Sequence, residues 1–300
     1  MTIAVTGANG GVGRNLLAHV AERGDLTATA VVRSERAAAA LPSSSSITPR
    51  IISFGDVGEL TQVLQGASCV VHLAGILIES ATARYESANV ASTAVVVAAA
   101  QDAGVRHIVL VSVIGASTDS RNRYLRSKGE AESAVRSSGV PSTIIRTPML
   151  LGRGTAAAAA LVRTAQLGRA RLLAGGHYSM RPLDLDDLSL AILHVCSTPS
   201  EGAIIHELFG PETVRYRDLV ARAADMMGQE LIIGTMPVWM AKVSAAITHR
   251  VRGGGISPTV IDVITADEDV RTNAAAELGV GLTPLSTTLE KILLDRAGAP

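Results

Sequence analysis

The sequence predicts an α/β fold, a doubly wound parallel sheet of the Rossmann type with a small C-terminal lobe. Across residues 1–146, short β-branched apolar runs alternate with longer segments of helical periodicity. Runs such as IVLVS and CVVHLA are apolar at consecutive positions, which is typical of strands covered by helices on both faces. With 300 residues, 47% of them apolar, and 27 basic against 27 acidic side chains, the chain can bury a large core and is not disordered.

Six strands and four helices follow from this alternation. The expected strands are residues 3–6, 27–32, 50–54, 69–74, 107–113 and 142–146, and the expected helices are residues 11–23, 57–65, 85–103 and 121–138. Right-handed crossovers between parallel strands place a ligand at the carboxyl ends of the strands. We expect residues 1–150 to form this domain.

After residue 150 the pattern becomes irregular, and we expect residues 151–300 to form a smaller α/β lobe, with some elements returning to the sheet. Helices are expected near residues 155–168, 187–197 and 216–227, and a strand at residues 203–209. Residues 237–250 form a candidate amphipathic helix that could dock on a protein partner or a membrane surface. Packing of this helix on its own lobe is the favoured interpretation.

Charge and cysteine content exclude several classes of protein. The net charge is zero and basic residues do not alternate with aromatic ones, so nucleic-acid binding is not expected. Cys69 and Cys196 are far apart in the sequence and the seven histidines are scattered, so neither a metal site nor a disulfide framework is expected. The N-terminal residues lack the pattern of a signal peptide, which together with the cysteine content predicts a cytoplasmic protein.

A glycine-rich turn joins the first expected strand to the first expected helix. It comprises Thr6, Gly7, Ala8, Asn9, Gly10, Gly11, Val12 and Gly13. Glycines let the backbone turn tightly and approach a pyrophosphate closely, while the N-terminus of the helix offers free N–H groups and a partial positive charge. Its position between a strand and a helix indicates a dinucleotide-binding turn rather than an ordinary glycine loop.

The end of the second strand indicates which dinucleotide is bound. Proteins that select NAD place an Asp or Glu about 20 residues after the glycines, whereas this chain has Val32, Arg33 and Ser34 there. Arg33 could pair with a 2′-phosphate through charge-assisted hydrogen bonds, which favours NADP over NAD, or could be a solvated surface arginine. Asp56, after the third strand, could accept a hydrogen bond from adenine or cap the next helix.

Tyr124 and Lys128 form the most specific catalytic motif. The chain has only four tyrosines and three lysines, and these two residues lie four positions apart, on one face of an expected helix. An ammonium beside a phenol stabilises the phenolate and lowers its pKa from about 10, which would suit Tyr124 to exchange a proton with a carbonyl or hydroxyl oxygen. A surface pair on a charged helix is the alternative.

Taken together, these segments resemble the short-chain dehydrogenase/reductases, in particular their extended or atypical branch and its NmrA-like and complex I accessory-subunit-like proteins. Besides the glycine turn, the resemblance is carried by VHLAG at residues 71–75, NVAST at residues 89–93, YLRSK at residues 124–128, STIIRTPMLLGRG at residues 142–154 and PLDLDD at residues 182–187. It covers most of the chain.

The resemblance implies catalytic roles at matching positions. Tyr124 would be the catalytic acid or base, and Lys128 would hold the nicotinamide ribose and tune the tyrosine. Members of the family also use a Ser or Thr after the fifth strand, usually within a Ser-Ser pair. This chain departs from that pattern with the letters SVI, so that Ser112 at the strand end, or Ser117 beyond it, would take this role.

For the cofactor, the resemblance implies contacts from the glycine turn and from Asp56, Val57, Ala74 and Gly75. The implied activity is that of an NADP-dependent oxidoreductase, with NAD as the alternative cofactor, that exchanges a hydride with a carbonyl, alcohol or activated double bond of a small apolar substrate. The alternative is a nicotinamide-nucleotide-binding redox sensor or structural accessory protein without turnover. The expected pocket walls are residues 76–85, 112–122, 147–154 and 175–181, and the expected state is a monomer or homodimer.

Overall fold

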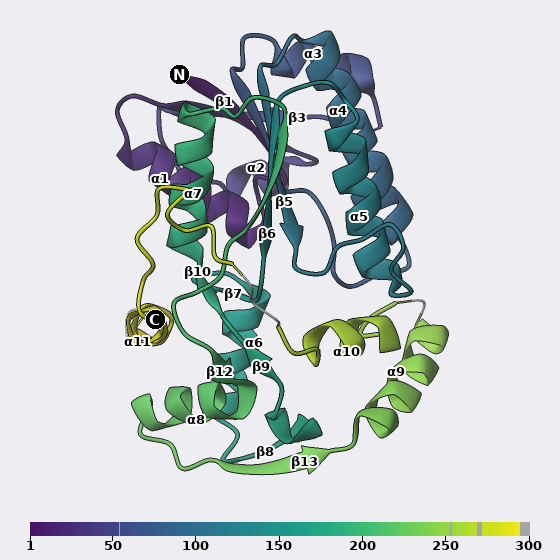
Figure 1. Cartoon of the computed structure of the whole chain (residues 1–300), viewed down its shortest axis with the longest axis vertical. Coiled ribbons are helices and arrows are strands. Elements are labelled where there is room, and N and C mark those ends of the chain that lie inside the picture. The colour runs from purple at the N-terminus through teal and green to yellow at the C-terminus, as the bar shows by residue number, and fades with distance from the viewer. Residues whose placement is uncertain (54, 253, 269–271, 295–300) are drawn as a thin grey trace.

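The computed structural model describes residues 1–53, 55–252, 254–268 and 272–294, and its centre is a parallel sheet with helices on both faces (Figure 1). The strands of this sheet are β1 (Thr2–Thr6), β2 (Thr27–Val32), β3 (Ile47–Ile51), β4 (Cys69–His72), β5 (His107–Val113), β6 (Ser142–Thr147) and β11 (Ala203–Glu207). They lie in the order β11-β6-β5-β4-β1-β2-β3, and each neighbouring pair is parallel. The predicted doubly wound fold is confirmed.

The two faces of the sheet are covered by different helices. Helices α1 (Gly11–Glu22) and α7 (Leu185–Ser197) lie on one face, and α3 (Val57–Leu64), α4 (Ser92–Asp102) and α5 (Arg123–Arg136) lie on the other (Figure 1). Successive strand residues point to opposite faces, so Val5 packs with the first pair of helices while Ala4 packs with the second group. This alternation explains why the strands are apolar at consecutive positions.

Two elements differ from the sequence prediction. β3 begins before Pro49, whereas the strand was expected at residues 50–54, and Phe54 lies outside the described residues. Because β3 is an edge strand, a proline without an N–H is tolerated in it. The helix expected at residues 85–103 starts instead as a π-helix, η1 (Glu86–Ala91), before it continues as α4.

The second half of the chain is divided between the sheet and the lobe. β11 pairs with β6, and α7 packs beside α1, so residues 185–207 return to the main sheet. The remaining elements are a short α2 (Glu35–Ala39) after β2 and, in the lobe, β7 (Leu150–Leu151), α6 (Ala156–Ala165), β8 (Arg169–Leu173), η2 (Ala174–Gly176), β9 (Ser179–Met180), β10 (Leu183–Asp184), β12 (Val214–Arg215), α8 (Tyr216–Met226), β13 (Ile232–Met236), α9 (Val238–Arg252), α10 (Pro258–Ile264) and α11 (Leu285–Leu294). No helix in the described part of the chain is long and apolar enough to cross a membrane.

The two cysteines, which the sequence separates, meet between β4 and α7. The Sγ atoms of Cys69 and Cys196 are 3.1 Å apart, and both side chains are buried as free thiols. The hydrogen bond between them and burial raise the pKa of the Cys69 thiol. Their sequence separation therefore did not indicate their proximity in space.

Candidate functional site

The glycine turn lies where the order of the strands reverses. β1 pairs with β2 on one side and with β4 on the other, and ligands of doubly wound sheets bind in the crevice at such a switch point. Gly7 has a φ of +72°, and a Cβ atom on it would lie 2.7 Å from the backbone nitrogen of Ala74. Only glycine fits here, because the turn after β1 touches the loop after β4.

The first turn of α1 is free to receive an anion. Its N-cap, Gly10, makes no side-chain capping bond, so the first N–H groups of the helix have no side-chain acceptor at that position. A Cβ on Gly13 would lie 2.5 Å from the carbonyl oxygen of Ala8, which shows how tightly the helix sits on the turn. A Cβ on Gly11 would lie 2.8 Å from the carbonyl oxygen of Gly154, so a loop of the second half of the chain also reaches this turn.

Lys128 points from α5 to the crevice. Its Nζ donates to the carbonyl oxygen of Val111 at 2.9 Å, and the side chain is buried. Burial lowers the pKa of Lys128 to about 8, although nearby Glu132 acts in the opposite direction. A Cβ on Gly75 would lie 4.0 Å from Nζ of Lys128 and 3.1 Å from Oδ1 of Asn89. The structure therefore brings Gly75 and Lys128 together.

Tyr124 lies one turn before Lys128 on α5 and is half-buried. Its ring centroid is 5.7 Å from that of Tyr85, with the two planes tilted by 51°. Burial, together with Tyr85, raises the pKa of Tyr124 above its ordinary value. The expected lowering by Lys128 is therefore wrong for this structure, because the ammonium bonds to the Val111 carbonyl and burial of the phenol dominates. Tyr124 is a neutral phenol, able to donate a proton.

Ser112 lies near the end of β5 with an unpaired hydroxyl group. The side chain is buried, and its Oγ has no hydrogen-bond partner among the described residues. Ser117 is exposed, and its Oγ accepts a hydrogen bond from the backbone N–H of Asp119 at 3.3 Å. Of the two serines considered from the sequence, Ser112 has the enclosed hydroxyl without a partner in the described part of the chain, and Ser117 has the exposed one.

A chain of hydrogen bonds between uncharged groups lies below the crevice, and the sequence did not predict these contacts. Thr93 Oγ1 donates to the carbonyl of Asn89 at 2.6 Å, so it accepts from Nε2–H of His72 at 3.0 Å. Nδ1 of His72 then accepts from Thr6 Oγ1 at 2.6 Å. Burial, reinforced by Lys128, lowers the pKa of His72 to about 3, so the ring is neutral.

Asn89 connects this chain to the next loop and to α5. Its Oδ1 accepts from the N–H of Ile76 at 2.8 Å, while its Nδ2 donates to the Ile76 carbonyl at 3.2 Å and to Ser127 Oγ at 3.0 Å. Asn89 lies within η1, and π-turns are frequent at functional sites. We call Thr6, His72, Thr93, Asn89 and Ser127 the crevice network. Its members lie in the glycine turn and in the VHLAG, NVAST and YLRSK segments, but the sequence did not indicate that they contact one another.

At the other end of the crevice, Arg33 lines a cleft of about 440 Å³ together with Ile51, Ile52, Ser53 and Glu59. Arg33 is exposed and has no hydrogen bond or ion pair within the described ranges. Glu59, which sequence reasoning missed, accepts from the N–H of Ser53 at 3.1 Å. The cleft thus offers a cation for a phosphate and a carboxylate for a hydroxyl.

Asp56 caps a helix, as one of its two predicted roles required. Its Oδ1 accepts from the backbone N–H of Glu59 at 3.0 Å, at the start of α3. Val57, the first residue of α3, is partly exposed. Asp56 bonds to Glu59, which lines the Arg33 cleft, and Val57 lies between these two residues in the sequence. The structure therefore places Asp56 and Val57 beside the Arg33 cleft.

Tyr85 lies beside Tyr124 at the edge of the candidate site, and we call the residues around Tyr85 the mouth of the site. Buried Glu79 accepts from the Tyr85 N–H at 3.1 Å and from Arg123 at 3.2 and 3.4 Å, and the Tyr85 hydroxyl donates to the Leu77 carbonyl at 2.7 Å. The N–H of Gly255 donates to the Glu79 carbonyl at 2.9 Å. Gly255, which precedes α10, thereby lies next to the loop of Glu79, and the Tyr85 ring contacts that of Tyr124.

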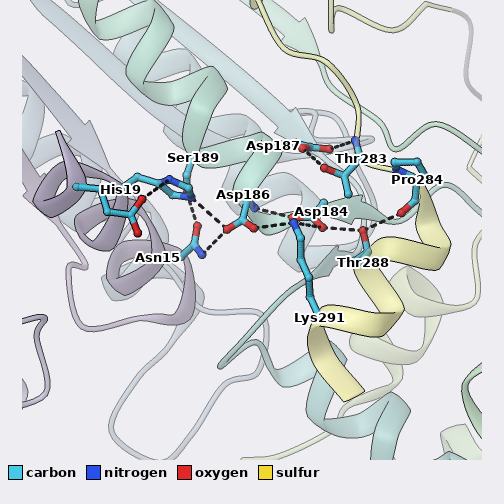
Figure 2. A network of polar contacts seen from close by, with 11 residues as sticks. Asn15, His19, Asp184, Asp186, Asp187, Ser189, Thr283, Pro284, Thr288 and Lys291 are labelled. Carbon is cyan, nitrogen blue, oxygen red and sulfur yellow. Dashed lines mark hydrogen bonds and ion pairs between the residues drawn. The ribbon is translucent and has the colours of Figure 1, made fainter. Parts of the chain in front are cut away.

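The acidic residues at the start of α7 lie away from this mouth and fasten the C-terminal helix (Figure 2). Asp184 is the N-cap of α7, and Lys291 of α11 donates to Asp184 at 3.1 Å and to Asp186 at 2.7 Å. Asn15 and His19 of α1 contact Asp186 at 2.9 and 3.1 Å. We call Asn15, His19, Asp184, Asp186, Thr288 and Lys291 the C-terminal network. Within the residues that the structure describes, no three His, Cys, Asp or Glu side chains are grouped as metal ligands.

With this geometry in place, comparisons with known proteins are informative. A family model described as NAD(P)H-binding matches residues 7–171, more than half of the chain. The chain is 30% identical over 230 residues to (4-alkanoyl-5-oxo-2,5-dihydrofuran-3-yl)methyl phosphate reductase of Streptomyces griseus, covering 76% of this chain and 75% of that protein. It is 25% identical over 229 residues to ceramide reductase of Caulobacter vibrioides, covering 75% and 70%.

A third relative is named as a subunit of a larger enzyme. NADH dehydrogenase [ubiquinone] 1 alpha subcomplex subunit 9, a mitochondrial protein of Arabidopsis thaliana, is 27% identical over 319 aligned positions, covering 99% of this chain and 78% of that protein. Among solved structures, MoeE5 in complex with UDP-glucuronic acid and NAD has a TM-score of 0.78 at 21% identity, covering 100% of both chains. NADPH-dependent quinone oxidoreductase of Escherichia coli in complex with NADPH has a TM-score of 0.73 at 20% identity, covering 97% and 99%.

Proposed function

Because the chain belongs to the NAD(P)H-binding family, within the extended and atypical short-chain dehydrogenase/reductases, we propose that it is an NADP-dependent oxidoreductase. Its substrate is a small apolar molecule with a carbonyl, alcohol or activated double bond. The observation that carries this proposal is the convergence of the glycine turn, Gly75 and Lys128 at the switch point of the sheet, with Tyr124 one turn away. The names of two relatives, both reductases, support it.

The residues present fit a nicotinamide dinucleotide. The glycine turn leaves no room for side chains, and the first turn of α1 has N–H groups for a pyrophosphate. When bound, the nicotinamide supplies or accepts a hydride. Lys128, buried beside Gly75, would bind the nicotinamide ribose, and Asp56 and Val57 lie beside the cleft that would receive the adenine end.

Proton transfer is assigned to Tyr124. Burial and Tyr85 raise the pKa of Tyr124, so this side chain carries its proton at neutral pH and would donate it to the carbonyl oxygen of a bound substrate. Lys128, with a pKa of about 8, is largely cationic at pH 7, and its ammonium donates to the Val111 carbonyl, so its proposed role is to bind the nicotinamide ribose. The unpaired hydroxyl of Ser112 would donate a hydrogen bond to the reacting oxygen.

Replacement of Tyr124 by Phe tests the enzymatic role. Oxidation of NADPH is followed over a panel of small apolar ketones, aldehydes and quinones, and cofactor affinity is measured by calorimetry. Loss of the proton donor should reduce kcat by roughly 10²–10⁴-fold with little change in the Kd for NADPH. Tyr216→Phe, in α8, is the matched control and should retain activity. Equal activity of parent and Tyr124→Phe would refute the assignment.

The cofactor preference depends on Arg33. Arg33→Ala should weaken NADPH binding by at least roughly tenfold, or about 1.4 kcal/mol, while NADH binding changes little. Glu59→Gln is the complementary variant, since the carboxylate in the same cleft would repel a 2′-phosphate and bind a ribose hydroxyl. If Arg33→Ala leaves NADPH binding intact while Glu59→Gln weakens NADH binding, the chain uses NAD.

A binding protein without turnover is the second candidate. It is supported by the relative that spans 99% of this chain, which is named as a subunit of NADH dehydrogenase. On this alternative, the protein binds NADPH with the same dependence on Arg33, but no member of the substrate panel is reduced and Tyr124→Phe has no effect. The two candidates thus differ in the phenotype of Tyr124 and not in that of Arg33.

A further inference from the structure

Helix α9 presents a row of large apolar side chains that no described residue covers. Trp239, Val243, Ile247 and Val251 follow one another at intervals of four residues, with exposed fractions of 68%, 54%, 62% and 80%, and Met240 beside them is 50% exposed. Trp239 is the only tryptophan of the chain. Residues spaced four apart share one face of a helix, so these side chains form a continuous apolar surface.

The charge on α9 has one sign. The helix contains Lys242, His249 and Arg250, and its sequence contains no acidic residue. Lys242 pairs with Asp262 of α10, which anchors the helix from its inner side, and Ala245 is buried there. Arg250 is exposed near the end of the apolar row.

The apolar row continues toward the mouth of the site. Beyond α9, Ile256 is 54% exposed, and Ile78 on the facing loop is 44% exposed. The two loops are in contact, because the N–H of Gly255 donates to the Glu79 carbonyl and a Cβ on Gly254 would lie 2.6 Å from the Cα of Ser80. In Figure 1, α9 stands at the outer corner of the molecule beside α10, and both lie below α5.

We propose that α9, together with Ile256 and Ile78, docks on the surface of an anionic lipid bilayer. An exposed apolar row with the cationic Arg250 beside it matches the boundary between acyl chains and anionic headgroups, and tryptophan prefers that boundary. A second copy of the chain fits less well, because α9 has no acidic residue to pair with Arg250 of the other copy. If the proposed function holds as well, the mouth beside Tyr85 faces the bilayer, where an apolar substrate is dissolved.

Trp239 makes the docking directly measurable. Its fluorescence is recorded as the full-length protein is titrated with phosphatidylcholine vesicles, with and without phosphatidylglycerol. We expect a blue shift with the anionic vesicles, quenching by brominated acyl chains, and partitioning weakened roughly tenfold with neutral vesicles or in 0.5 M NaCl.

Two double variants distinguish vesicle binding through this surface from nonspecific binding by any exposed apolar side chain. Val243→Glu with Ile247→Glu should abolish the binding to anionic vesicles. Leu167→Glu with Ile232→Glu is the matched control, because these apolar side chains are 61% and 59% exposed elsewhere on the lobe, and it should bind as the parent does. Circular dichroism and NADPH binding verify that both variants are folded. If the parent protein does not bind NADPH, that result counts against the proposed function and not against docking.

Three results would overturn the proposal. The first is an unchanged Trp239 spectrum with anionic vesicles. The second is equal partitioning into neutral and anionic vesicles. The third is a blue shift that depends on protein concentration without lipid, accompanied by a doubled mass in light scattering, which would assign the surface to a second copy of the chain.

Discussion

The crevice network and the C-terminal network both contain a histidine, but this histidine bonds to neutral hydroxyl groups in the first and to a carboxylate in the second. In the crevice network, His72 is fully enclosed and bonds to the hydroxyls of Thr6 and Thr93. In the C-terminal network, His19 is partly exposed and bonds to the carboxylate of Asp186, which also receives Lys291 (Figure 2). Neutral partners hold the first and charged partners hold the second.

The pKa values of the two histidines diverge as a result. Burial lowers the pKa of His72 to about 3, while the hydrogen bond with Asp186 raises the pKa of His19 above 6.5. The residues below the cofactor site therefore keep one hydrogen-bond pattern at all physiological pH values. The C-terminal helix, in contrast, is held by contacts that respond to pH and salt.

The largest effect of this difference should appear with His72→Gln on acidification. The native pKa of about 3 lies below the unfolded value of 6.5, so the unfolded state binds the extra proton first and stability falls as the pH drops from 6.5 toward 3. Between pH 7 and pH 4 the parent should lose roughly 3 kcal/mol through His72 alone. Glutamine can accept from Thr6 and donate to Thr93 without titrating, so urea unfolding at several pH values should show a flatter dependence. Identical slopes for both proteins would contradict this.

Lys128→Met should have the next largest effect on stability, and one of the same sign, because the native pKa of Lys128 is also lowered. The native pKa of about 8 lies below the unfolded value of 10.5, because burial disfavours the ammonium, so the charge destabilises the fold at pH 7. Removal of the charge, with the hydrogen bond to Val111 lost, should stabilise the protein by roughly 1–3 kcal/mol at pH 7. The parent gains stability as the pH rises from 8 to 10.5, so the difference should shrink at pH 9, and NADPH binding should weaken. A destabilised variant would show that Lys128 is structural.

The residues of the candidate site also show how much of its structure the sequence could predict. The alternation of strands and helices and the glycine turn follow from local patterns, whereas the cofactor roles of Gly75 and Lys128 came from the family resemblance. The sign of the pKa shift at Tyr124 follows from neither, because it depends on the burial of its ring and on Tyr85, which lies 39 positions earlier at the start of η1.

The same limit applies to the partners of each polar residue. His72 was recognised only as part of a family segment, since its hydroxyl partners come from β1 and from α4, which the fold brings together. Glu59 was missed because a carboxylate on a helix gives no sequence signal for a cleft formed by the ends of two strands. Sequence patterns therefore predicted the elements, and contacts between elements required the structure.

In the C-terminal network, Asp186→Asn should have a moderate and salt-sensitive effect. The variant loses the ionic part of the bonds to His19 and Lys291, while Asn15 can still donate to the new side chain. After allowance for partial exposure, we expect a loss of roughly 1–2 kcal/mol in low salt and less in 0.5 M NaCl. Faster proteolysis of α11 would locate the change. Asp102→Asn, at the exposed end of α4, is the control, and a loss independent of salt would argue against an ionic origin.

His19→Gln should have the smallest effect and the pH dependence opposite to that of His72→Gln. Because the native pKa of His19 lies above the unfolded value, its contribution is fully present below pH 6.5 and is lost as the pH rises through the native pKa. The side chain is 22% exposed, so screening keeps the contribution to roughly 0.5 kcal/mol. Urea unfolding of parent and variant at pH 5.5 and pH 8.5 should give a difference only at the lower pH. A difference that grew toward pH 8.5 would mean that His19 binds Asp186 as a neutral ring, and the contrast between the two networks would then be one of burial and not of charge.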